Sequence, residues 1–238
     1  FFLGSVLMRS AGCIVNDISD KEFDKKVSRT KNRPIASNQV SIKLGIFYTF
    51  ILCLLAFLVL INFNNLTILL ALGSMPLAFT YPLMKRFTYW PQLFLGITFN
   101  YGLVLGWTAI QAEINVVAII FYLGAIFWTL GYDTIYGFQD IKDDEIIGIK
   151  STSIKFKKDP KNFVTMCYVF LILSILVLGL IMNYDYIFYL SLLLTIIHLF
   201  FYQVKNFNSK IPMNCLKIFK SNNTIGLIIF FNILIGSI

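Results

Sequence analysis

The chain reads Asn16-Asp17-Ile18-Ser19-Asp20-Lys21-Glu22-Phe23-Asp24 directly after an apolar segment that runs from residue 1 to residue 15. Four carboxylates therefore stand at the end of a helix suited to hydrocarbon. Acidic residues beside hydrocarbon are costly, and where they occur they usually mark a functional site. The stretch predicts a helix that reaches one face of a membrane and ends there beside such a site.

Composition places the chain among integral membrane proteins. Of its 238 residues, 58% are hydrophobic and 13% are charged, and the mean hydropathy of +0.76 lies well outside the range of soluble domains. No charged segment followed by a short apolar stretch and a cleavage site is present, so we expect no removable signal peptide. The apolar pattern is already under way at Phe1, so we expect a further N-terminal segment, up to a whole helix, to precede it.

Apolar stretches of helical length follow one another along the chain. They predict eight transmembrane helices at about 1–15, 44–61, 66–81, 93–110, 116–132, 163–182, 186–203 and 225–238. Several are shorter than the roughly 20 residues that a perpendicular helix needs, so their ends are approximate. No solenoid repeat, low-complexity tract or linker divides the chain. The predicted fold is all-α, a polytopic transmembrane helix bundle forming a single domain over residues 1–238.

The basic residues indicate which side of the membrane each loop faces. Seven Lys or Arg lie in loop 16–43, two in 82–92, six in 133–162 and four in 205–224, whereas the intervening loops hold none. These loops contain 19 of the 20 basic residues, and the remaining one, Arg9, lies inside the first apolar stretch. The positive-inside rule makes the basic side cytoplasmic, where lysines also contact anionic lipid. The net charge of +8 is therefore a topology signal and gives no support for nucleic-acid binding.

Nine of the twelve Asp and Glu residues fall in two clusters on this cytoplasmic side. They are Asp17, Asp20, Glu22 and Asp24 in the first cluster, and Asp133, Asp140, Asp143, Asp144 and Glu145 in the second. On a helix, a spacing of four places Asn16, Asp20 and Asp24 on one face, with Arg9 nearly on the same stripe. Spacings of seven and four group Asp133, Asp140 and Asp144 in the same way. Glu22 is expected to be only a solvated neighbour.

Each acidic face needs positive charge nearby, because like charges at a spacing of four repel. Oxygen ligands without His or Cys point to Mg²⁺ rather than to zinc. Either cluster alone is equally well explained as a solvated helix end whose carboxylates balance neighbouring lysines. Two clusters on one side of the membrane, each beside an apolar stretch, favour a functional site.

A diphosphate with an apolar tail is the substrate that such a site suits. Metal ions bound by the carboxylates would contact its oxygens and neutralise the charge that builds up on the leaving group. Lys85 and Arg86, in an otherwise nearly uncharged loop on the same side, are candidates to complete the site, and Lys150 is another. Lys85 and Arg86 could equally be topology signals, and for Lys150 the topology signal is the favoured interpretation.

Two motifs resemble a known family. Residues 8–24, which contain the spacing NDxxDxxxD, resemble the first aspartate motif of the UbiA-type membrane aromatic prenyltransferases. Residues 132–152 resemble the second, with Asp140 and Asp144 at its DxxxD positions. The resemblance covers almost the whole chain and implies nine helices around a central cavity, one more than the eight apolar stretches predict.

Three further segments are similar to one branch of that family, which prenylates 4-hydroxybenzoate in ubiquinone synthesis. They are Asn32-Arg33-Pro34-Ile35, Tyr81-Pro82-Leu83-Met84-Lys85-Arg86 and Tyr132-Asp133-Thr134-Ile135-Tyr136. The implied reaction is Mg²⁺-dependent transfer of a polyprenyl group from polyprenyl diphosphate to the ring carbon ortho to the hydroxyl of 4-hydroxybenzoate. The implied location is the bacterial inner membrane in preference to the mitochondrial one, with the active site on the cytoplasmic face.

The resemblance also implies a role for each polar residue. Asp20, Asp24, Asp140 and Asp144 would be catalytic and carry Mg²⁺, Asn16 and Asp17 would help to shape the first site, Lys85 and Arg86 would bind the diphosphate with Tyr81 beside it, and Arg9 would line the pocket of the aromatic acceptor. Asp133 and Lys150 are further candidates for binding substrate. The partners so implied are polyprenyl diphosphate, 4-hydroxybenzoate and the lipid bilayer.

Several alternatives stay open at the level of sequence. The same fold could act on dihydroxynaphthoate or haem. An ion-coupled transporter would also contain buried acids, but near the midplane, at broken helices in two related halves, and no such repeat is visible. A soluble prenyl diphosphate synthase shares the two aspartate motifs but not the apolar stretches. Clustering of the charge disfavours a non-catalytic scaffold.

The remaining reactive residue types predict packing more than chemistry. Cys13, Cys53, Cys167 and Cys215 lack metal-binding spacing and are expected to be small core residues. His198 is expected to be a hydrogen-bonded histidine within the bundle. Among the aromatic residues, Tyr136 and Phe138 are the candidates near the site for stabilising an allylic cation through their π faces.

Overall fold

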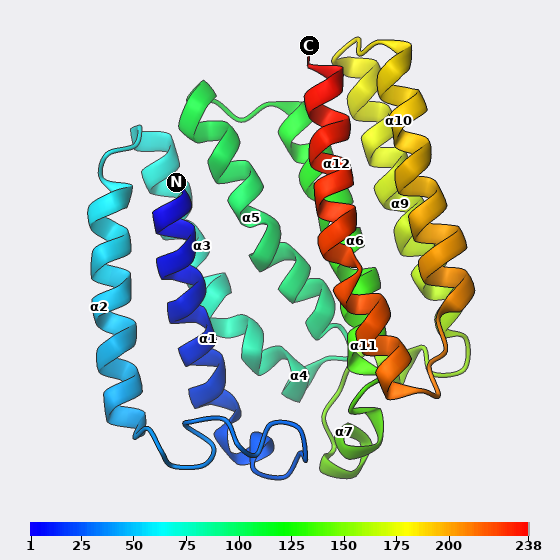
Figure 1. The fold of residues 1–238 in the computed structure, drawn as a ribbon. Coiled ribbons are helices and arrows are strands. Elements are labelled where there is room, and N and C mark those ends of the chain that lie inside the picture. Colours follow the sequence, from blue (N-terminus) through cyan, green and yellow to red (C-terminus); the bar gives the residue numbers. More distant parts are fainter. Residues whose placement is uncertain (238) are drawn as a thin grey trace. The chain divides into compact units, whose positions relative to one another are not determined.

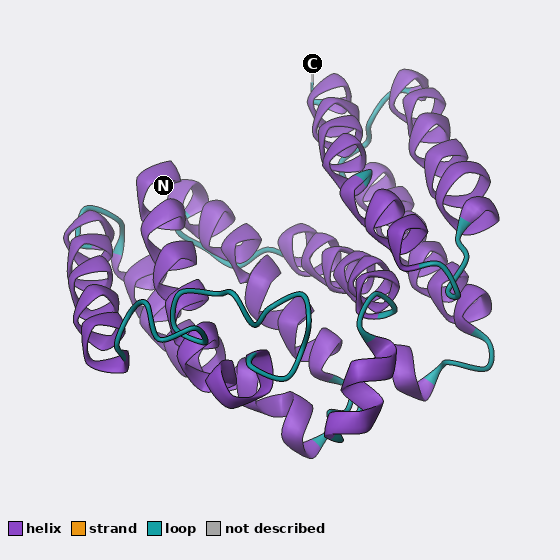
Figure 2. Ribbon diagram, turned by 60° about the horizontal axis from the view of Figure 1, so that its bottom comes forward, coloured by secondary structure: helices purple, strands orange, loops and turns teal. Residues whose placement is uncertain are grey.

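The computed structural model describes residues 1–237, and within them every regular element is helical (Figures 1 and 2). The α-helices are α1 (Phe2–Asp24), α2 (Ile42–Leu60), α3 (Asn65–Thr80), α4 (Met84–Phe87), α5 (Pro91–Gln111), α6 (Val116–Gly137), α7 (Ile141–Ile147), α8 (Thr152–Lys155), α9 (Pro160–Ile181), α10 (Tyr186–Ile196), α11 (Pro212–Lys220) and α12 (Asn222–Gly236). A 3₁₀-helix, η1 (Tyr81–Leu83), joins α3 to α4, and a π-helix, η2 (Ile197–Val204), continues α10. The predicted all-helical class is confirmed.

Seven helical stretches in residues 1–237 are long and apolar enough to cross a membrane, so the chain is a multi-pass membrane protein. They are Ile42–Leu60, Asn65–Phe87, Pro91–Gln111, Val116–Gly137, Pro160–Ile181, Tyr186–Val204 and Pro212–Gly236. Eight were predicted. The eighth, α1, forms a helix of 23 residues, but Arg9 and its carboxylate-rich C-terminal turns keep it outside this set.

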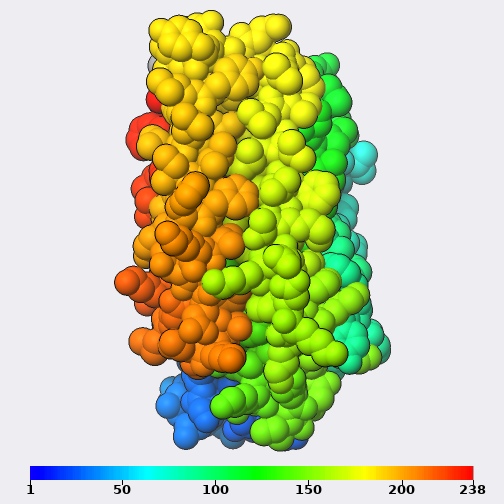
Figure 3. Space-filling view, turned by 90° about the vertical axis from the view of Figure 1, so that its right-hand side faces the viewer, coloured from blue at the N-terminus to red at the C-terminus, as the bar shows by residue number. Residues whose placement is uncertain are grey.

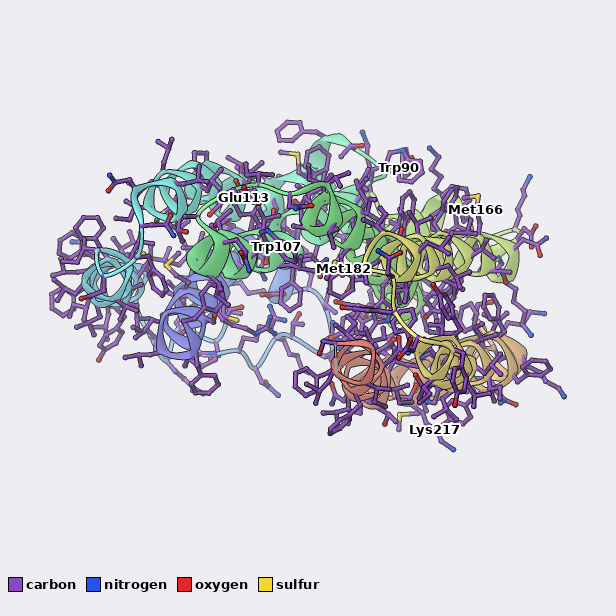
Figure 4. All side chains as sticks on the ribbon, turned by 90° about the horizontal axis from the view of Figure 1, so that it is seen from above. Trp90, Trp107, Glu113, Met166, Met182 and Lys217 are labelled. Carbon is purple, nitrogen blue, oxygen red and sulfur yellow. The ribbon has the colours of Figure 1, made fainter. Side chains whose placement is uncertain are left out.

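Two predicted loops are largely helical. The loop expected at 82–92 continues α3 through η1 and α4 as far as Phe87. The loop expected at 205–224 contains α11, which leads into α12 as one stretch from Pro212 to Gly236. On α11, Cys215 and Ile218 are buried, whereas Lys217 lies at the periphery in the view of Figure 4. Because apolar and lysine positions alternate around this helix, its mean hydropathy resembled that of a loop.

The chain forms two compact units, and the first consists of residues Phe1–Ile114 together with Lys142–Lys150. In it α1 packs against α2, and α3 against α5. Gly45 in α2 permits the first contact, since a Cβ there would lie 3.2 Å from Cδ1 of Ile18 in α1. At the other pair, Nδ2 of Asn64 donates to the carbonyl oxygen of Thr108 at 2.7 Å.

The second unit consists of Asn115–Ile141 and the chain from Ser151 onward. Its main packing joins α6 to α9, where two glycines of α6 let the helices approach closely. A Cβ at Gly131 would lie 2.7 Å from Cε1 of Tyr168, and one at Gly124 would lie 2.7 Å from Cβ of Ser174. The buried core of this unit is apolar, with Tyr168, Leu171, Ile175, Phe188, Leu192 and Leu199 among its fully enclosed side chains.

Figure 3 shows the side of the second unit that is formed by α9 and α10, and many exposed side chains of these helices are apolar, as a surface in contact with hydrocarbon requires. Phe170, Leu173, Leu190 and Phe201 are among its exposed side chains. Exposed apolar side chains of this kind would favour aggregation in water but are neutral against lipid tails.

Some cysteine and histidine predictions were wrong. All four cysteines are free thiols, and Cys167 and Cys215 are buried as expected, but Cys13 is exposed and Cys53 only partly buried. Both lie on helices of the first unit whose faces are less covered by neighbours. His198 has a buried Nδ1 without a hydrogen-bond partner, because its ring lies against Tyr202, at 4.9 Å between centroids, instead of meeting a polar group.

Close packing at Gly131 gives a test of the fold. We expect Gly131→Ala to lower the free energy of unfolding by about 1–3 kcal/mol, because the new methyl group overlaps the buried Tyr168 ring. Thermal unfolding in detergent measures the change. Gly102→Ala is the matched control, since no atom lies within 4 Å of a Cβ at that helical position, and it should not destabilise the protein. Equal stability of both variants would contradict the assigned α6–α9 contact.

Candidate functional site

The first acidic run forms the C-terminal turns of α1. Asp20 and Asp24 are spaced by one turn, and only 4% and 7% of their surfaces are exposed. Glu22 points the other way, with a side chain 75% exposed and paired to Lys25 at 2.7 Å. The face predicted from the spacing of four is therefore present, and it is buried.

Lys85 is the cation closest to Asp20. Its Nζ lies 2.5 Å from Oδ2 of Asp20, so the helical extension through η1 and α4 brings a lysine from far along the chain to the end of α1. The neighbouring Arg86 donates through Nη2 to the carbonyl oxygen of Ser19 at 2.5 Å. Both cations also lie over the Phe23 ring, at 5.5 and 5.2 Å from its centroid. Two residues predicted to bind the substrate thus adjoin the first acidic run.

Arg33 is a site residue that the sequence analysis did not assign. Its Nη1 contacts Oδ1 of Asp17 at 3.0 Å and Oδ2 of Asp24 at 3.1 Å. The loop that carries it folds back on α1 because its own apolar residues Val27, Ile35 and Ala36 are buried. The only signal for Arg33 in the sequence is its position in the Asn32-Arg33-Pro34-Ile35 segment that resembles the family.

Burial dominates the electrostatics of this cluster. Withdrawal from solvent raises the pKa of Asp20, and the Lys85 ammonium opposes that rise without cancelling it. The pKa of Asp17 is raised for the same reason, with Arg33 opposing. Oδ1 of Asp20 is buried without a hydrogen-bond partner. A desolvated carboxylate oxygen of this kind is a good acceptor for a further cation or a strong donor.

The segment Lys142–Lys150 belongs to the same unit through Lys150. Its backbone N–H donates to the carbonyl oxygen of Lys85 at 2.9 Å, and its Nζ donates to the carbonyl oxygen of Phe87 at 3.2 Å. The ammonium also lies 5.7 Å from the centroid of the Tyr89 ring. Lys150 therefore attaches the segment that contains Asp144 to helix α4, which contains Lys85.

Other predicted residues occupy the same unit in separate positions. Arg9 is exposed on α1, with its guanidinium carbon 5.0 Å from the centroid of Phe99 in α5. Asn16 is partly buried on α1 one turn before Asp20, and Tyr81 is partly buried in η1 one turn before Lys85.

Asp133 and Asp140 belong to the second unit. Asp133 lies in the last turns of α6, and Asp140 in the turn between α6 and α7. Hydrogen bonds from the following segment hold this end of α6: the hydroxyls of Thr134 and Thr152 lie 2.6 Å apart, and Oγ of Ser153 donates to the carbonyl oxygen of Thr134 at 2.7 Å.

The carboxylates fit Mg²⁺ by donor chemistry. Within residues 1–237, no three His, Cys, Asp or Glu side chains are grouped so as to hold a metal ion by themselves. Mg²⁺, however, is commonly bound through one or two carboxylates together with phosphate oxygens of a substrate. The unpartnered Oδ1 of Asp20 is an oxygen of that kind.

A family model described as the UbiA prenyltransferase family matches residues 1–233. A mitochondrial 4-hydroxybenzoate polyprenyltransferase from Bos taurus is 42% identical over 239 residues, covering all of this chain and 64% of its own length. A 4-hydroxybenzoate octaprenyltransferase from Francisella tularensis subsp. novicida is 42% identical over 231 residues, covering 97% of this chain and 81% of its own. The chain thus spans less than two thirds of the length of the bovine relative.

Solved structures show the same fold. A UbiA homologue from Aeropyrum pernix K1 matches with a TM-score of 0.81 at 22% identity, covering 100% of this chain and 91% of that one. A UbiA homologue from Archaeoglobus fulgidus bound to GPP and Mg²⁺ matches with a TM-score of 0.68 at 15% identity, covering 100% of this chain and 89% of that one.

The two ion pairs of Arg33 give a test of the cluster. We expect Arg33→Met to speed hydrogen–deuterium exchange in residues 25–41 and to lower the free energy of unfolding by about 1.5–3 kcal/mol, since it leaves a buried carboxylate without its charged donor. Mass spectrometry of peptides from this loop measures the exchange. Lys31→Met, an exposed cation in the same loop, is the control and should change neither quantity. Unchanged exchange in Arg33→Met would remove the loop from the cluster.

Proposed function

The chain belongs to the UbiA prenyltransferase family, and on that premise we propose that it transfers a polyprenyl group from polyprenyl diphosphate to 4-hydroxybenzoate. The observation that carries the proposal is the junction of Asp20 with Lys85. There a desolvated carboxylate and a cation meet at the end of an apolar helix, as the diphosphate end of a lipid-soluble substrate requires. The names of the bovine and Francisella relatives support the acceptor.

Asp20 and Asp24 would hold Mg²⁺, and the proposal gives Asp140 and Asp144 the same role because they repeat the spacing of four. The bound ion would supply charge neutralisation for the diphosphate leaving group. The Archaeoglobus homologue, which binds GPP and Mg²⁺ together, supports this assignment. Asn16 and Asp17 would shape the metal site, and Asp133 would lie beside the substrate.

Cationic side chains would bind the diphosphate oxygens. Lys85 already has its ammonium directed at the carboxylate cluster, and Arg86 is anchored to the backbone of α1 through one nitrogen. Lys150 holds the main chain next to Lys85, and Tyr81, one turn earlier, would flank the site. Once the C–O bond of the allylic diphosphate breaks, these donors stabilise the charge on the departing diphosphate.

The aromatic acceptor needs a cation for its carboxylate, and Arg9 would provide it. Breaking of the C–O bond of the donor gives diphosphate and an allylic cation. The ring carbon ortho to the hydroxyl then forms a bond to that cation and loses its proton. The products are 3-polyprenyl-4-hydroxybenzoate and diphosphate. Dihydroxynaphthoate and haem are the competing acceptors within this chemistry.

We place the protein in a cell inner membrane, with the end of α1 on the cytoplasmic face. The concentration of Lys and Arg in four loops on one side supports that orientation. The Francisella relative supports a bacterial membrane and the bovine one a mitochondrial membrane, and the proposal favours the bacterial one.

A membrane assay tests the proposed function. Membranes containing the protein are offered labelled 4-hydroxybenzoate or dihydroxynaphthoate with polyprenyl diphosphate, with Mg²⁺ and with excess EDTA. The proposal requires a labelled lipid product from 4-hydroxybenzoate that disappears with EDTA. If only dihydroxynaphthoate is prenylated, then it is the acceptor in place of 4-hydroxybenzoate. If neither acceptor is prenylated, the proposed function is wrong.

Asp20 should be indispensable. We expect Asp20→Ala to lower the rate of transfer by on the order of 10²–10³-fold or more, as loss of a preorganised charge at the reacting centre does, while the protein still inserts into membranes. Glu22→Ala removes an exposed carboxylate from the same helix two residues away and should retain activity. Normal turnover by Asp20→Ala would exclude the metal-binding role.

Arg9 should act on the acceptor alone. We expect Arg9→Ala to raise the KM for 4-hydroxybenzoate about ten-fold or more, because a charge-assisted hydrogen bond contributes roughly 1.5–3 kcal/mol, and to leave the KM for polyprenyl diphosphate unchanged. Steady-state kinetics with each substrate varied in turn measures both constants. An unchanged KM for the aromatic acid would remove Arg9 from the acceptor pocket.

A further inference from the structure

Three aromatic residues of α6 form a stripe at spacings of four. Trp128 meets Tyr132 edge to face, with ring centroids 5.7 Å apart. Phe219 of α11 covers the next two positions, at 5.7 Å from Tyr132 and 4.4 Å from Tyr136. All four rings lie in the second unit, and each remains partly exposed. We call Trp128, Tyr132, Tyr136 and Phe219 the aromatic stripe.

The far end of the stripe is held by a buried hydrogen-bond network. Nε1 of Trp128 donates to Oδ1 of Asn222 at 2.9 Å, and the same oxygen accepts from Nε2 of Gln203 at 3.2 Å. Oε1 of Gln203 accepts from the hydroxyl of Tyr168 at 2.5 Å. Gln203 belongs to the π-helix and is fully buried. The orientation of the indole is therefore fixed by side chains of α9, η2 and α12.

Gly226 of α12 leaves room for the ring of Trp128. A Cβ at Gly226 would lie 3.5 Å from Cη2 of the indole, so the ring rests on the backbone of α12.

Two other aromatic residues near the stripe pack elsewhere. Phe127 stacks on Phe170 of α9, at 4.6 Å and 22°. Phe138 is 3% exposed and packs on Phe207 in the core, so the sequence-based suggestion that it stabilises a cation is wrong.

The stripe ends near one of the proposed Mg²⁺ ligands. Helix α6 finishes at Gly137, and Asp140 follows in the next turn. Trp128 precedes Gly137, the end of α6, by nine residues, which corresponds to about 14 Å of helix, and Asp140 follows in the turn beyond it. A chain whose charged end lay at Asp140 could therefore contact Tyr136 with its first unit and Trp128 only with a later one.

We propose that the aromatic stripe is the surface along which the isoprenoid chain of the donor lies, and that Trp128 at its far end determines the preference for long donors. This inference rests on the proposed function. π faces attract an allylic cation and pack well against flat unsaturated groups. Ordinary lipid-facing positions of the same helix, such as Ile119 and Leu123, are exposed and aliphatic.

Donors of different length test the inference. Wild-type protein and the variants Trp128→Leu and Tyr136→Leu are assayed with dimethylallyl diphosphate and with octaprenyl diphosphate, using 4-hydroxybenzoate as acceptor. Trp128→Leu should lower kcat/KM about ten-fold for the octaprenyl donor, the effect of losing about 1.4 kcal/mol, and less than two-fold for the dimethylallyl donor. Tyr136→Leu should lower both. Phe127→Leu, on the α9 side of the helix, should leave the ratio between donors unchanged.

Asn222 is a positioning residue in this scheme. Asn222→Leu should reproduce the octaprenyl-specific loss, because the indole is no longer held, whereas Asn222→Asp keeps an oxygen acceptor for Nε1 and should restore most of the preference. A general loss of packing would lower activity with both donors equally.

The outcomes separate the two proposals. A wild-type protein that uses neither donor overturns the proposed function and the inference with it. A wild-type protein that uses both donors, together with a Trp128→Leu variant whose donor ratio is unchanged, overturns the inference and leaves the proposed function standing. Thermal unfolding of each variant accompanies the kinetics, and Trp128→Phe, which keeps a ring but loses the bond to Asn222, should give an intermediate ratio if Trp128→Leu fails to fold.

Discussion

Two buried carboxylates at the end of an apolar helix are the constraint on which the first unit depends. Asp20 and Asp24 lie one turn apart and are almost fully withdrawn from solvent, where an unpaired charge costs several kcal/mol and where each also repels the other. The lysines just after α1 do not relieve that cost, because Lys25 and Lys26 are exposed and Lys25 pairs with Glu22 instead. The compensating cations must come from elsewhere, and Lys85 and Arg33 do so.

The course of the chain around α1 follows from this requirement. Helix α3 continues through a 3₁₀ turn into α4 instead of ending at Thr80, and this extension delivers Lys85. Loop 25–41 is irregular yet anchored by its own buried apolar residues, and this anchoring delivers Arg33. Lys150 then attaches the segment with Asp144 to the backbone of Lys85. Three stretches far apart in sequence are thereby assembled around one helix end.

Periodicity in the sequence predicted the helices and the common face of Asp20 and Asp24, because each depends on residues a few positions apart. Charge placed against an apolar background singled out Lys85, which the structure places beside Asp20. Arg33 was missed because its two ion pairs depend on how an irregular loop folds back, which no helical or strand period encodes. The lysines of α11 lower the local hydropathy, so the sequence predicts a loop there, although Cys215 and Ile218 are buried in the core. Phe138 and Tyr136 could not be told apart by type, and only packing shows that Phe138 belongs to the core.

Neutral polar side chains such as those of Gln203 and Asn222 are buried in the described part of the second unit, and they impose a different constraint. A buried amide such as that of Gln203 is stable only when its donors and acceptors are all matched, so the π-helix, Tyr168 and Asn222 have to be in place together. Trp128 takes its fixed orientation from that network. Preorganised side chains matter most for a ligand as flexible as an isoprenoid chain. Ordering the chain already costs binding free energy, and side chains that also became ordered on binding would lower the affinity further. An aromatic side chain that only faced lipid would not need a hydrogen-bond network to fix its orientation. A side chain that selects an isoprenoid chain by its length does need one.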